Sequence, residues 1–194
     1  MTRNTPPLFQ SHLDFAHGFW GKFLKKEDVV IDATCGGGYD TVFLSTLSDY
    51  VIGLDIQEEA IKKTMDRLPP EKKNKVRLYK QSHESFPKSI QKGSVTLIVY
   101  NLGYFPGGDK SITTQTSVTL ESVKNGMQLL KNGGVISITA YPGHPEGKVE
   151  ESALSEYLSK LNPKEWSVTH HRWINRDLSP SLFFVQNNCR NDKL

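Results

Sequence analysis

The chain of 194 residues has little cysteine and no long apolar run. Two cysteines are too few for a disulfide framework. The longest apolar stretch, Val95–Tyr100, is far too short to span a bilayer. The segment Met1–Pro7 is polar and does not resemble a signal peptide. These absences predict a cytoplasmic protein that has no membrane partner.

The sequence also lacks the short motifs of several enzyme classes. No HxxxH, CxxC or carboxylate cluster indicates a metal site, so no metal is expected. No GxSxG indicates a hydrolase. A net charge of +3 is too small to indicate nucleic-acid binding by itself.

Basic residues are nevertheless concentrated in two places. Eight lysines and arginines lie between positions 62 and 80, where a solvated, lysine-rich face is the favoured interpretation. A second group lies near the C-terminus beside Trp173: His170, His171, Arg172 and Arg176. Cations next to an aromatic ring are typical of phosphate contact and base stacking.

Helical and strand patterns alternate along the chain and predict one α/β domain over residues 1–194. The expected helices are 11–23, 40–46, 58–67, 86–90, 113–130 and 150–161. The expected strands are 29–32, 51–55, 76–81, 95–100, 135–141, 166–174 and 182–186. This order indicates a Rossmann-like, doubly wound and mostly parallel sheet that ends in an antiparallel hairpin. The functional site is then expected outside the carboxyl ends of the parallel strands.

The first of these βα units has the features of a nucleotide-cofactor site. An apolar strand ends at Asp32, the glycines Gly36–Gly38 follow, and a second apolar strand ends at Asp55. Glycines let the backbone approach a ligand closely because they carry no Cβ. Asp55 lies 17 residues after Gly38, near the roughly 20-residue spacing of a carboxylate that binds a ribose diol.

The glycine pattern favours S-adenosylmethionine over a dinucleotide. A third glycine one helical turn further on, which a nicotinamide-dependent oxidoreductase would need, is missing, so that class is disfavoured. The run fits the acid-x-x-x-Gly-x-Gly loop of methyltransferases, with Asp32 and the loop backbone facing the methionine end. The residues predicted to bind the cofactor are Asp32, Thr34, Gly36, Gly38, Asp40, Thr41, Asp55, Gln57, Ser82, His83 and Asn101.

Strand 95–100 is followed by Asn101-Leu102-Gly103-Tyr104, which resembles the Asn-Pro-Pro-Tyr element of methyltransferases that act on nitrogen. The Asn101 amide oxygen and the Leu102 carbonyl can accept amine hydrogens and aim the nitrogen lone pair, and Tyr104 can stack on a base. His83 is expected at the adenine edge, with a role as a base near the substrate as the alternative. Ser82 could simply cap a helix. His144 lies in a Gly/Pro loop, where it could take up a proton or merely be exposed.

These motifs occur in the same order in one known family, and the similarity covers nearly the whole chain from Ala16-His17 to Asn175. The family was long labelled as rRNA methylases and has a class I methyltransferase fold. It is associated with methylation of the 5-aminomethyl group of the tRNA wobble uridine. The resemblance implies that S-adenosylmethionine is the cofactor and that the tRNA anticodon loop is the partner. We therefore hypothesise that Asn101 and Tyr104 are catalytic residues, with Asp109 or His144 helping to accept the amine proton.

The chain departs from the family at two places. Tyr39 follows Gly36-Gly37-Gly38 where relatives have Gly-Asn-Gly-His, which puts any role of position 39 in doubt. Ser179-Pro180-Ser181 replaces a frequent Pro-Pro pair near the expected hairpin. Methylation of rRNA, of another RNA base or of a small-molecule amine remains an alternative, as does an RNA-binding module without catalysis. A homodimer through the edge hairpin also stays open.

Overall fold

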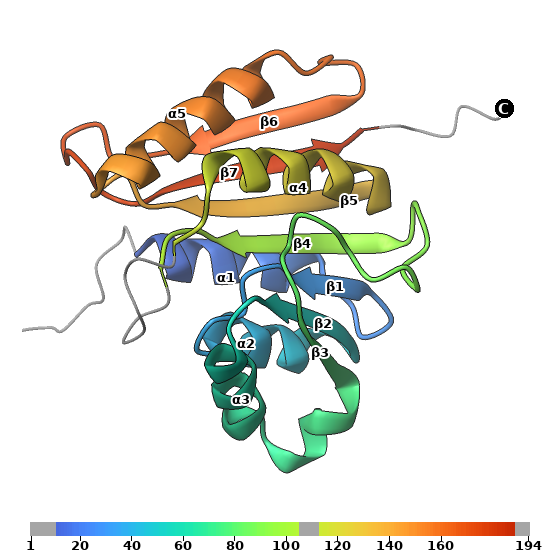
Figure 1. Ribbon diagram of the computed structural model, residues 1–194. Coiled ribbons are helices and arrows are strands. Elements are labelled where there is room, and N and C mark those ends of the chain that lie inside the picture. Colours follow the sequence, from blue (N-terminus) through green and yellow to red (C-terminus); the bar gives the residue numbers. More distant parts are fainter. Residues whose placement is uncertain (1–10, 105–112, 189–194) are drawn as a thin grey trace, which may run out of the picture.

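The computed structural model describes residues 11–104 and 113–188, which form a seven-stranded sheet covered by helices (Figure 1). The helices are α1 His12–Phe23, α2 Tyr39–Leu47, α3 Glu58–Arg67, α4 Thr116–Leu129 and α5 Pro145–Ser159, with a 3₁₀ turn at Pro70–Lys75. The strands are β1 Val29–Asp32, β2 Tyr50–Asp55, β3 Val76–Lys80, β4 Val95–Asn101, β5 Leu130–Ala140, β6 Trp166–His171 and β7 Ser181–Asn187.

The strand order β3-β2-β1-β4-β5-β7-β6 confirms the predicted Rossmann-like fold. The five strands from β3 to β5 are parallel, and β7 runs antiparallel between β5 and β6. β1 pairs with both β2 and β4, so the strand order reverses direction beside β1. A crevice at the carboxyl ends of β1 and β4 is where ligands bind in sheets of this kind.

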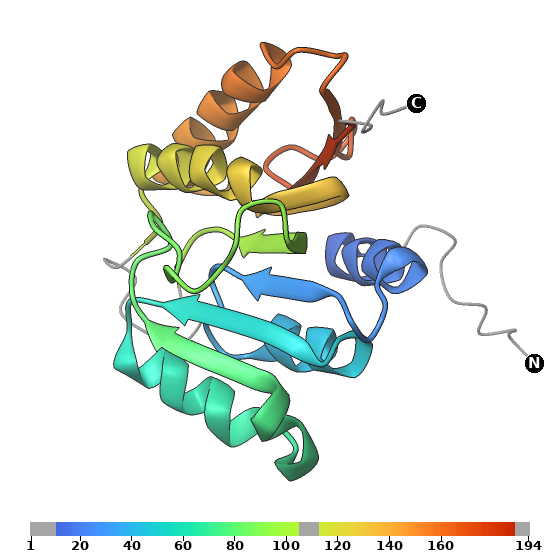
Figure 2. The ribbon, with the colours of Figure 1, turned by 90° about the vertical axis from the view of Figure 1, so that its right-hand side faces the viewer.

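Two apolar cores lie on opposite faces of the sheet, because its central strands are covered by helices on both sides (Figure 2). On one face, Trp20 of α1 and Leu44 of α2 are buried against Val30 and Leu97. The other core contains residues of α4 and α5. All seven residues of β4 except its last, Asn101, are buried. β4 therefore becomes partly exposed only at Asn101, where it reaches the crevice.

The structure corrects several predicted boundaries. No helix forms over 86–90; this segment consists of turns in which Ile90 N–H donates to the Pro87 carbonyl, because proline interrupts so short an apolar pattern. Helix 113–130 ends at Leu129, and β5 begins at Leu130 instead of Val135 because Leu130 pairs with Val95.

The helix predicted over 150–161 begins earlier, at Pro145, since the His144 side chain caps its first turn. The strand predicted over 166–174 ends at His171, where its pairing with β7 stops at Leu182. These differences concern element ends, and they leave the predicted order of the remaining elements unchanged.

Gly38 provides a test of how tightly the first loop is packed. Its φ is +80°, and a Cβ at this position would lie 2.8 Å from the Thr64 Cα atom of α3. We expect Gly38→Ala to lower the free energy of unfolding by about 2–4 kcal/mol, from left-handed strain together with overpacking. Gly18→Ala is the matched control: a Cβ there meets open space in α1, so a gain of about 0.5–1 kcal/mol is expected. Equal effects in chemical denaturation would contradict this account.

Candidate active site

A cavity of about 670 Å³ lies at the carboxyl ends of the parallel strands. Its walls come from the loops that follow β1, β2, β3, β4 and β5 and from the loop between β6 and β7. The volume is in the range that holds a cofactor-sized ligand. The cavity therefore lies at the edge of the sheet where the sequence predicts the site.

Asp55 joins the two loops that form one end of this cavity. Its Oδ2 accepts a hydrogen bond from Gly36 N–H at 2.9 Å, and its Oδ1 accepts one from Gln57 N–H at 2.9 Å. All three residues line the cavity. Burial raises the pKa of the Asp55 carboxyl above its ordinary value, against the opposing effect of these backbone hydrogen bonds. The carboxylate is thus held rigidly at the position predicted for a ribose contact.

Asp32 lies behind the cavity wall. It is 1% exposed, and it accepts hydrogen bonds from the Thr41 hydroxyl at 2.5 Å and from Thr34 N–H at 3.2 Å. Burial, together with the charge of Asp40, raises its pKa to about 7. Asp32 thereby fixes the turn from β1 into α2. Through its hydrogen bonds it positions Thr34, which lines the cavity, and Thr41 behind it.

The predicted cofactor residues divide into two groups in the structure. Those that line the cavity are Thr34, Gly36, Asp40, Asp55, Gln57, Ser82, His83 and Asn101. Asp32, Gly38 and Thr41 are not part of the lining and support it from behind. A direct contact with a ligand therefore remains a prediction for the first group, and the second group is expected to act by positioning.

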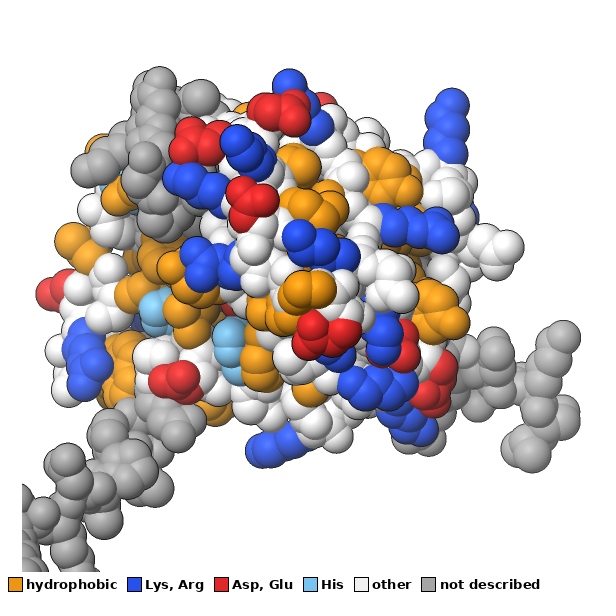
Figure 3. Space-filling view, turned by 90° about the horizontal axis from the view of Figure 1, so that it is seen from below, with side chains coloured by type: hydrophobic (Ala, Val, Ile, Leu, Met, Phe, Trp, Pro, Cys, Tyr) orange, Lys and Arg blue, Asp and Glu red, His pale blue; other side chains and the backbone are white. Residues whose placement is uncertain are grey.

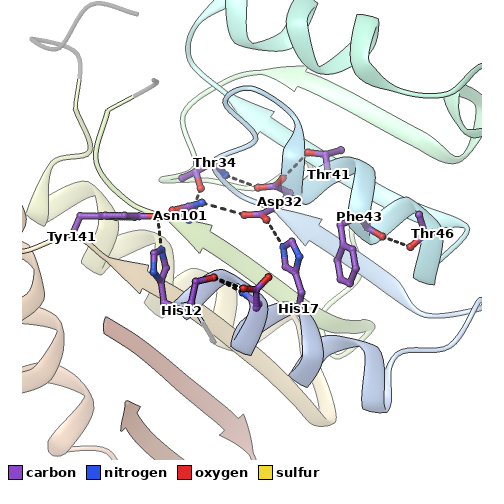
Figure 4. Close-up of polar contacts among 12 residues, drawn as sticks. His12, His17, Asp32, Thr34, Thr41, Phe43, Thr46, Asn101 and Tyr141 are labelled. Carbon is purple, nitrogen blue, oxygen red and sulfur yellow. Dashed lines mark hydrogen bonds and ion pairs between the residues drawn. The ribbon is translucent and has the colours of Figure 1, made fainter. Parts of the chain in front are cut away.

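Asn101 is held by two neighbours, Thr34 and Asp40, at the end of β4 (Figure 4). Its backbone N–H donates to the Thr34 hydroxyl at 2.7 Å, and its Nδ2 donates to Asp40 Oδ2 at 3.2 Å. Asp40 Oδ1 lies 2.7 Å from Nε2 of His17, whose ring stacks on Phe43 at 4.0 Å. Since the amide nitrogen is bound to a carboxylate, the orientation of the amide oxygen is fixed.

Tyr141 and His12 extend this network on the other side of Asn101 (Figure 4). The Tyr141 hydroxyl, which lines the cavity, lies 3.1 Å from Nε2 of His12. Burial, with the charge of Asp40, raises the pKa of Tyr141 to about 12, so the hydroxyl keeps its proton at neutral pH. Burial lowers the pKa of His12, which favours a neutral ring.

Sequence reasoning did not identify His12, His17 or Tyr141 as parts of the site. Both histidines lie on α1, which precedes β1 and carries no recognised motif. The available signals were two histidines five positions apart in a helix with an apolar face, and a tyrosine at the end of a predicted strand. Neither signal indicates which partners the fold brings near them.

His83 lines the cavity and is 9% exposed. Burial lowers its pKa to about 4, so the ring is neutral, and it packs edge-on against Tyr100 with centroids 5.9 Å apart. Its Nε2 has no hydrogen-bond partner among the residues that the structure describes. Ser82 accepts a hydrogen bond from Glu84 N–H in a turn, and no helix follows it to be capped. An unpaired ring nitrogen at this wall suits a contact with a bound base.

His144 caps α5 by accepting a hydrogen bond from Gly147 N–H at Nδ1, at 3.1 Å. A neutral ring that accepts at Nδ1 carries its proton on Nε2, so the latter is a donor. Its role as proton acceptor is therefore disfavoured, since a second proton would break the cap. Tyr104 lies at the cavity 6.3 Å from the His144 ring and is 41% exposed. The fourth predicted catalytic residue, Asp109, lies outside the described residues.

The high pKa of Asp32 gives a pH-dependent stability. The folded protein keeps this proton up to about pH 7, whereas the unfolded chain releases it near 3.8, so stability is lost as the pH rises through this window. The isosteric Asp32→Asn variant lacks the titration. We expect its free energy of unfolding, relative to the parent, to rise by on the order of 1–4 kcal/mol between pH 4 and pH 8. Parallel curves in urea titrations across this range would contradict the assignment.

Two kinds of feature are absent from residues 11–104 and 113–188. None of the helices in these ranges has the length and apolarity that crossing a membrane requires. The same part of the chain contains no group of three or more His, Cys, Asp and Glu side chains arranged to hold a metal ion.

Comparisons with known proteins identify the family of the chain. Residues 51–187 match the model of a family described as "Putative rRNA methylase". The tRNA (mnm(5)s(2)U34)-methyltransferase, chloroplastic, of Arabidopsis thaliana is 35% identical over 89% of this chain and 68% of its own length.

Two solved structures are also similar. A "putative rRNA-methylase" from Clostridium thermocellum has a TM-score of 0.88 and 33% identity, over 93% of this chain and 100% of the other. A "putative methyltransferase" from Streptococcus mutans, solved in complex with SAH, has a TM-score of 0.84 and 29% identity, over 93% and 99% of the two chains. The fold, the crevice at the strand ends and these matches together show that the chain belongs to the rRNA methylase family.

Proposed function

We propose that this protein is an S-adenosylmethionine-dependent methyltransferase that methylates the 5-aminomethyl nitrogen of (2-thio)uridine at the wobble position of tRNA. The methyltransferase class and its cofactor follow from membership of the family. The finer substrate assignment is supported by one observation above all. At the end of β4, Asp40 binds the nitrogen of the Asn101 amide and turns its oxygen into the position of a hydrogen-bond acceptor for an amine.

The cavity suits S-adenosylmethionine at both of its ends. The Asp55 carboxylate is placed to accept hydrogen bonds from a ribose diol, and Nε2 of His83 is available to the adenine edge. The glycine loop exposes backbone near Thr34 and Gly36 for the methionine end. When bound, the cofactor supplies an electrophilic methyl group on a sulfonium. The residues of this chain then have to present a nucleophile with its lone pair free.

An alkyl amine is protonated at neutral pH, because its ordinary pKa is about 10. It must lose one proton before its nitrogen can attack. The Asn101 oxygen and the Leu102 carbonyl can accept the remaining N–H groups and hold the lone pair in line with the methyl group. Attack by the nitrogen would form the new C–N bond while the methyl–sulfur bond breaks. S-adenosylhomocysteine would be the leaving group, and the product would be a secondary ammonium ion.

Asp40 is the proton acceptor that we infer for this site. It lines the cavity, its Oδ2 is adjacent to Asn101, and its Oδ1 is fixed by His17. Proton transfer from a bound ammonium ion to this carboxylate would free the nitrogen lone pair for attack. His144 is less suitable because its Nε2 already carries the proton.

The RNA substrate is proposed from the relatives. The Arabidopsis protein carries mnm(5)s(2)U34 in its name, whereas the family description names rRNA. The amine of an aminomethyl group fits a site in which Asn101 orients a nitrogen nucleophile. The wobble uridine of tRNA carries an aminomethyl group before it is methylated to the nucleoside named for the Arabidopsis protein. Methylation of rRNA is therefore the second candidate.

A transfer assay with labelled S-adenosylmethionine separates these substrates. The RNAs are tRNA whose wobble uridine stops at the aminomethyl stage and, in parallel, rRNA that lacks modifications. Nucleoside mass spectrometry is expected to find label in 5-methylaminomethyluridine from the tRNA. Label confined to rRNA would keep the enzyme class and overturn the substrate, and label in neither RNA would contradict RNA methylation.

Asn101→Ala removes the amide that holds the amine. We expect the rate of methyl transfer to fall by roughly 10²–10³-fold while the affinity for S-adenosylmethionine changes little, since the loss falls on the oriented nucleophile. Single-turnover kinetics and calorimetry measure the two quantities separately.

The complementary variant is Asp55→Ala, which removes the ribose contact and leaves the amine site intact. It should weaken cofactor binding roughly 10-fold or more, from the loss of charge-assisted hydrogen bonds. Near-normal transfer by Asn101→Ala, or unchanged cofactor affinity in Asp55→Ala, would sink the corresponding assignment.

A further inference from the structure

The loop between β6 and β7, residues 172–180, lies at the mouth of the cavity. At the first residue of β7, Ser181 pairs with Ala140, the last residue of β5. At the end of β6, His171 pairs with Leu182. The loop that joins the two strands therefore projects from the same sheet edge as the ends of β1, β2 and β4. Leu178 and Pro180 form part of the cavity wall.

Two large apolar side chains of this loop are exposed to solvent. Ile174 is 90% exposed and Leu178 is 60% exposed. Beside them, the Arg176 guanidinium carbon lies 4.2 Å from the centroid of the Trp173 ring. A flat aromatic–guanidinium stack next to exposed apolar groups is a surface on which an unpaired nucleic-acid base can lie.

Leu178 also has an unusual backbone conformation. Its φ is +60°, and it is the single residue other than glycine with a positive φ in the described part of the chain. Asparagine and glycine adopt this conformation more readily than leucine does. Backbone strain of this kind occurs most often at binding and catalytic sites, where a particular side chain is needed at that position.

The basic residues near the loop differ in their contacts: two histidines pack against aromatic rings of the fold, and two arginines belong to the loop itself. His170 stacks on Phe183 with centroids 3.9 Å apart, and His171 packs against Phe15 and Phe184. These rings therefore hold the hairpin against its neighbours. The cations of the loop itself are Arg172 and Arg176, against one acid, Asp177.

The larger basic group at positions 62–80 is less suited to RNA. Several of its cations lie in ion pairs on the surface: Lys63–Glu59 at 2.8 Å, Lys75–Asp49 at 2.7 Å and Lys80–Glu58 at 3.0 Å. Arg67 donates to the Gly37 carbonyl and covers the ring of Tyr39. In Figure 3, Lys and Arg side chains are interspersed with Asp and Glu on the face of the molecule seen from below. The favoured interpretation of a solvated face agrees with these pairs.

We propose that the β6–β7 loop binds the single-stranded nucleotides that flank the methylated uridine. One flanking base stacks on the Trp173–Arg176 pair, Leu178 packs against the sugar or base that enters the cavity, and Arg172 contacts a phosphate. This inference rests on the proposed function, since it requires an RNA substrate whose target base is displayed in a loop.

The test compares two substrates that share the reacting group. One is an anticodon stem-loop RNA that carries 5-aminomethyluridine. The other is free 5-aminomethyluridine, which has no flanking nucleotides to contact Trp173, Arg176 or Arg172. Trp173→Ala and Arg176→Gln are each expected to raise KM for the stem-loop roughly 5- to 50-fold, the range for loss of one stacked base. Their kcat/KM for the free nucleoside should stay within about twofold of the parent value.

Two further variants make the test specific. Tyr50→Ala is the matched control: this exposed aromatic begins β2, at the opposite edge of the sheet, and its loss should leave both substrates unaffected. Leu178→Asn relieves the strained φ, so it should keep or raise Tm while raising KM for the stem-loop. Arg172→Gln should reduce the salt dependence of stem-loop binding by about 0.7 in the slope of log K against log salt concentration.

The outcomes separate this inference from the proposed function. Stem-loop methylation by the parent with unchanged KM in Trp173→Ala and Arg176→Gln would overturn the loop's role and keep the function. Equal losses toward the stem-loop and the nucleoside would also overturn it, because the loop would then shape the cavity alone. A parent enzyme that methylates the nucleoside and neither binds nor methylates the stem-loop would overturn both.

Discussion

The hydrogen bond from Asn101 to Asp40 connects the parts of the molecule on which the proposed chemistry depends. It joins the end of β4 to the first turn of α2, and Asp40 continues the connection to His17 on α1. Three elements that are distant in the sequence thus fix one amide. A carboxylate binds the amide nitrogen, and the amide oxygen is a hydrogen-bond acceptor, which is the kind of group that the proposed amine substrate requires.

Negative charge at the edge of the sheet is the second feature of the site. Asp32, Asp40 and Asp55 lie close enough that the charge of Asp40 raises the pKa of Asp32 to about 7, after the larger effect of burial, and Asp55 adds to it. Three neighbouring carboxylates repel one another when ionised, which destabilises the folded protein unless cations lie nearby. A sulfonium and an alkyl ammonium are both cations, so the electrostatics of the cavity suit the pair of reactants proposed for it.

The parts of the structure that the sequence predicted are those in which a local pattern determines the outcome. Strands ending at Asp32, Asp55 and Asn101 read as apolar runs that stop at a polar residue, and they lie side by side because parallel strands end at one edge. The turn at 86–90 was mistaken for a helix because its apolar residues pack on the core without helical hydrogen bonds. His12 and His17 could not be assigned, since their partners come from segments 23 or more residues away. The sequence also did not indicate that Asp32 lies behind the cavity wall, because that position depends on its hydrogen bond with Thr41 of α2.

A crystal structure of the protein with S-adenosylhomocysteine and a stem-loop RNA carrying 5-aminomethyluridine tests the central claim most directly. The account predicts that the aminomethyl nitrogen lies at about 3 Å from the Asn101 amide oxygen, with Asp40 adjacent to it and the cofactor ribose on Asp55. A uridine bound in the cavity with its amine directed away from Asn101, or a cofactor bound away from Asp55, would contradict it.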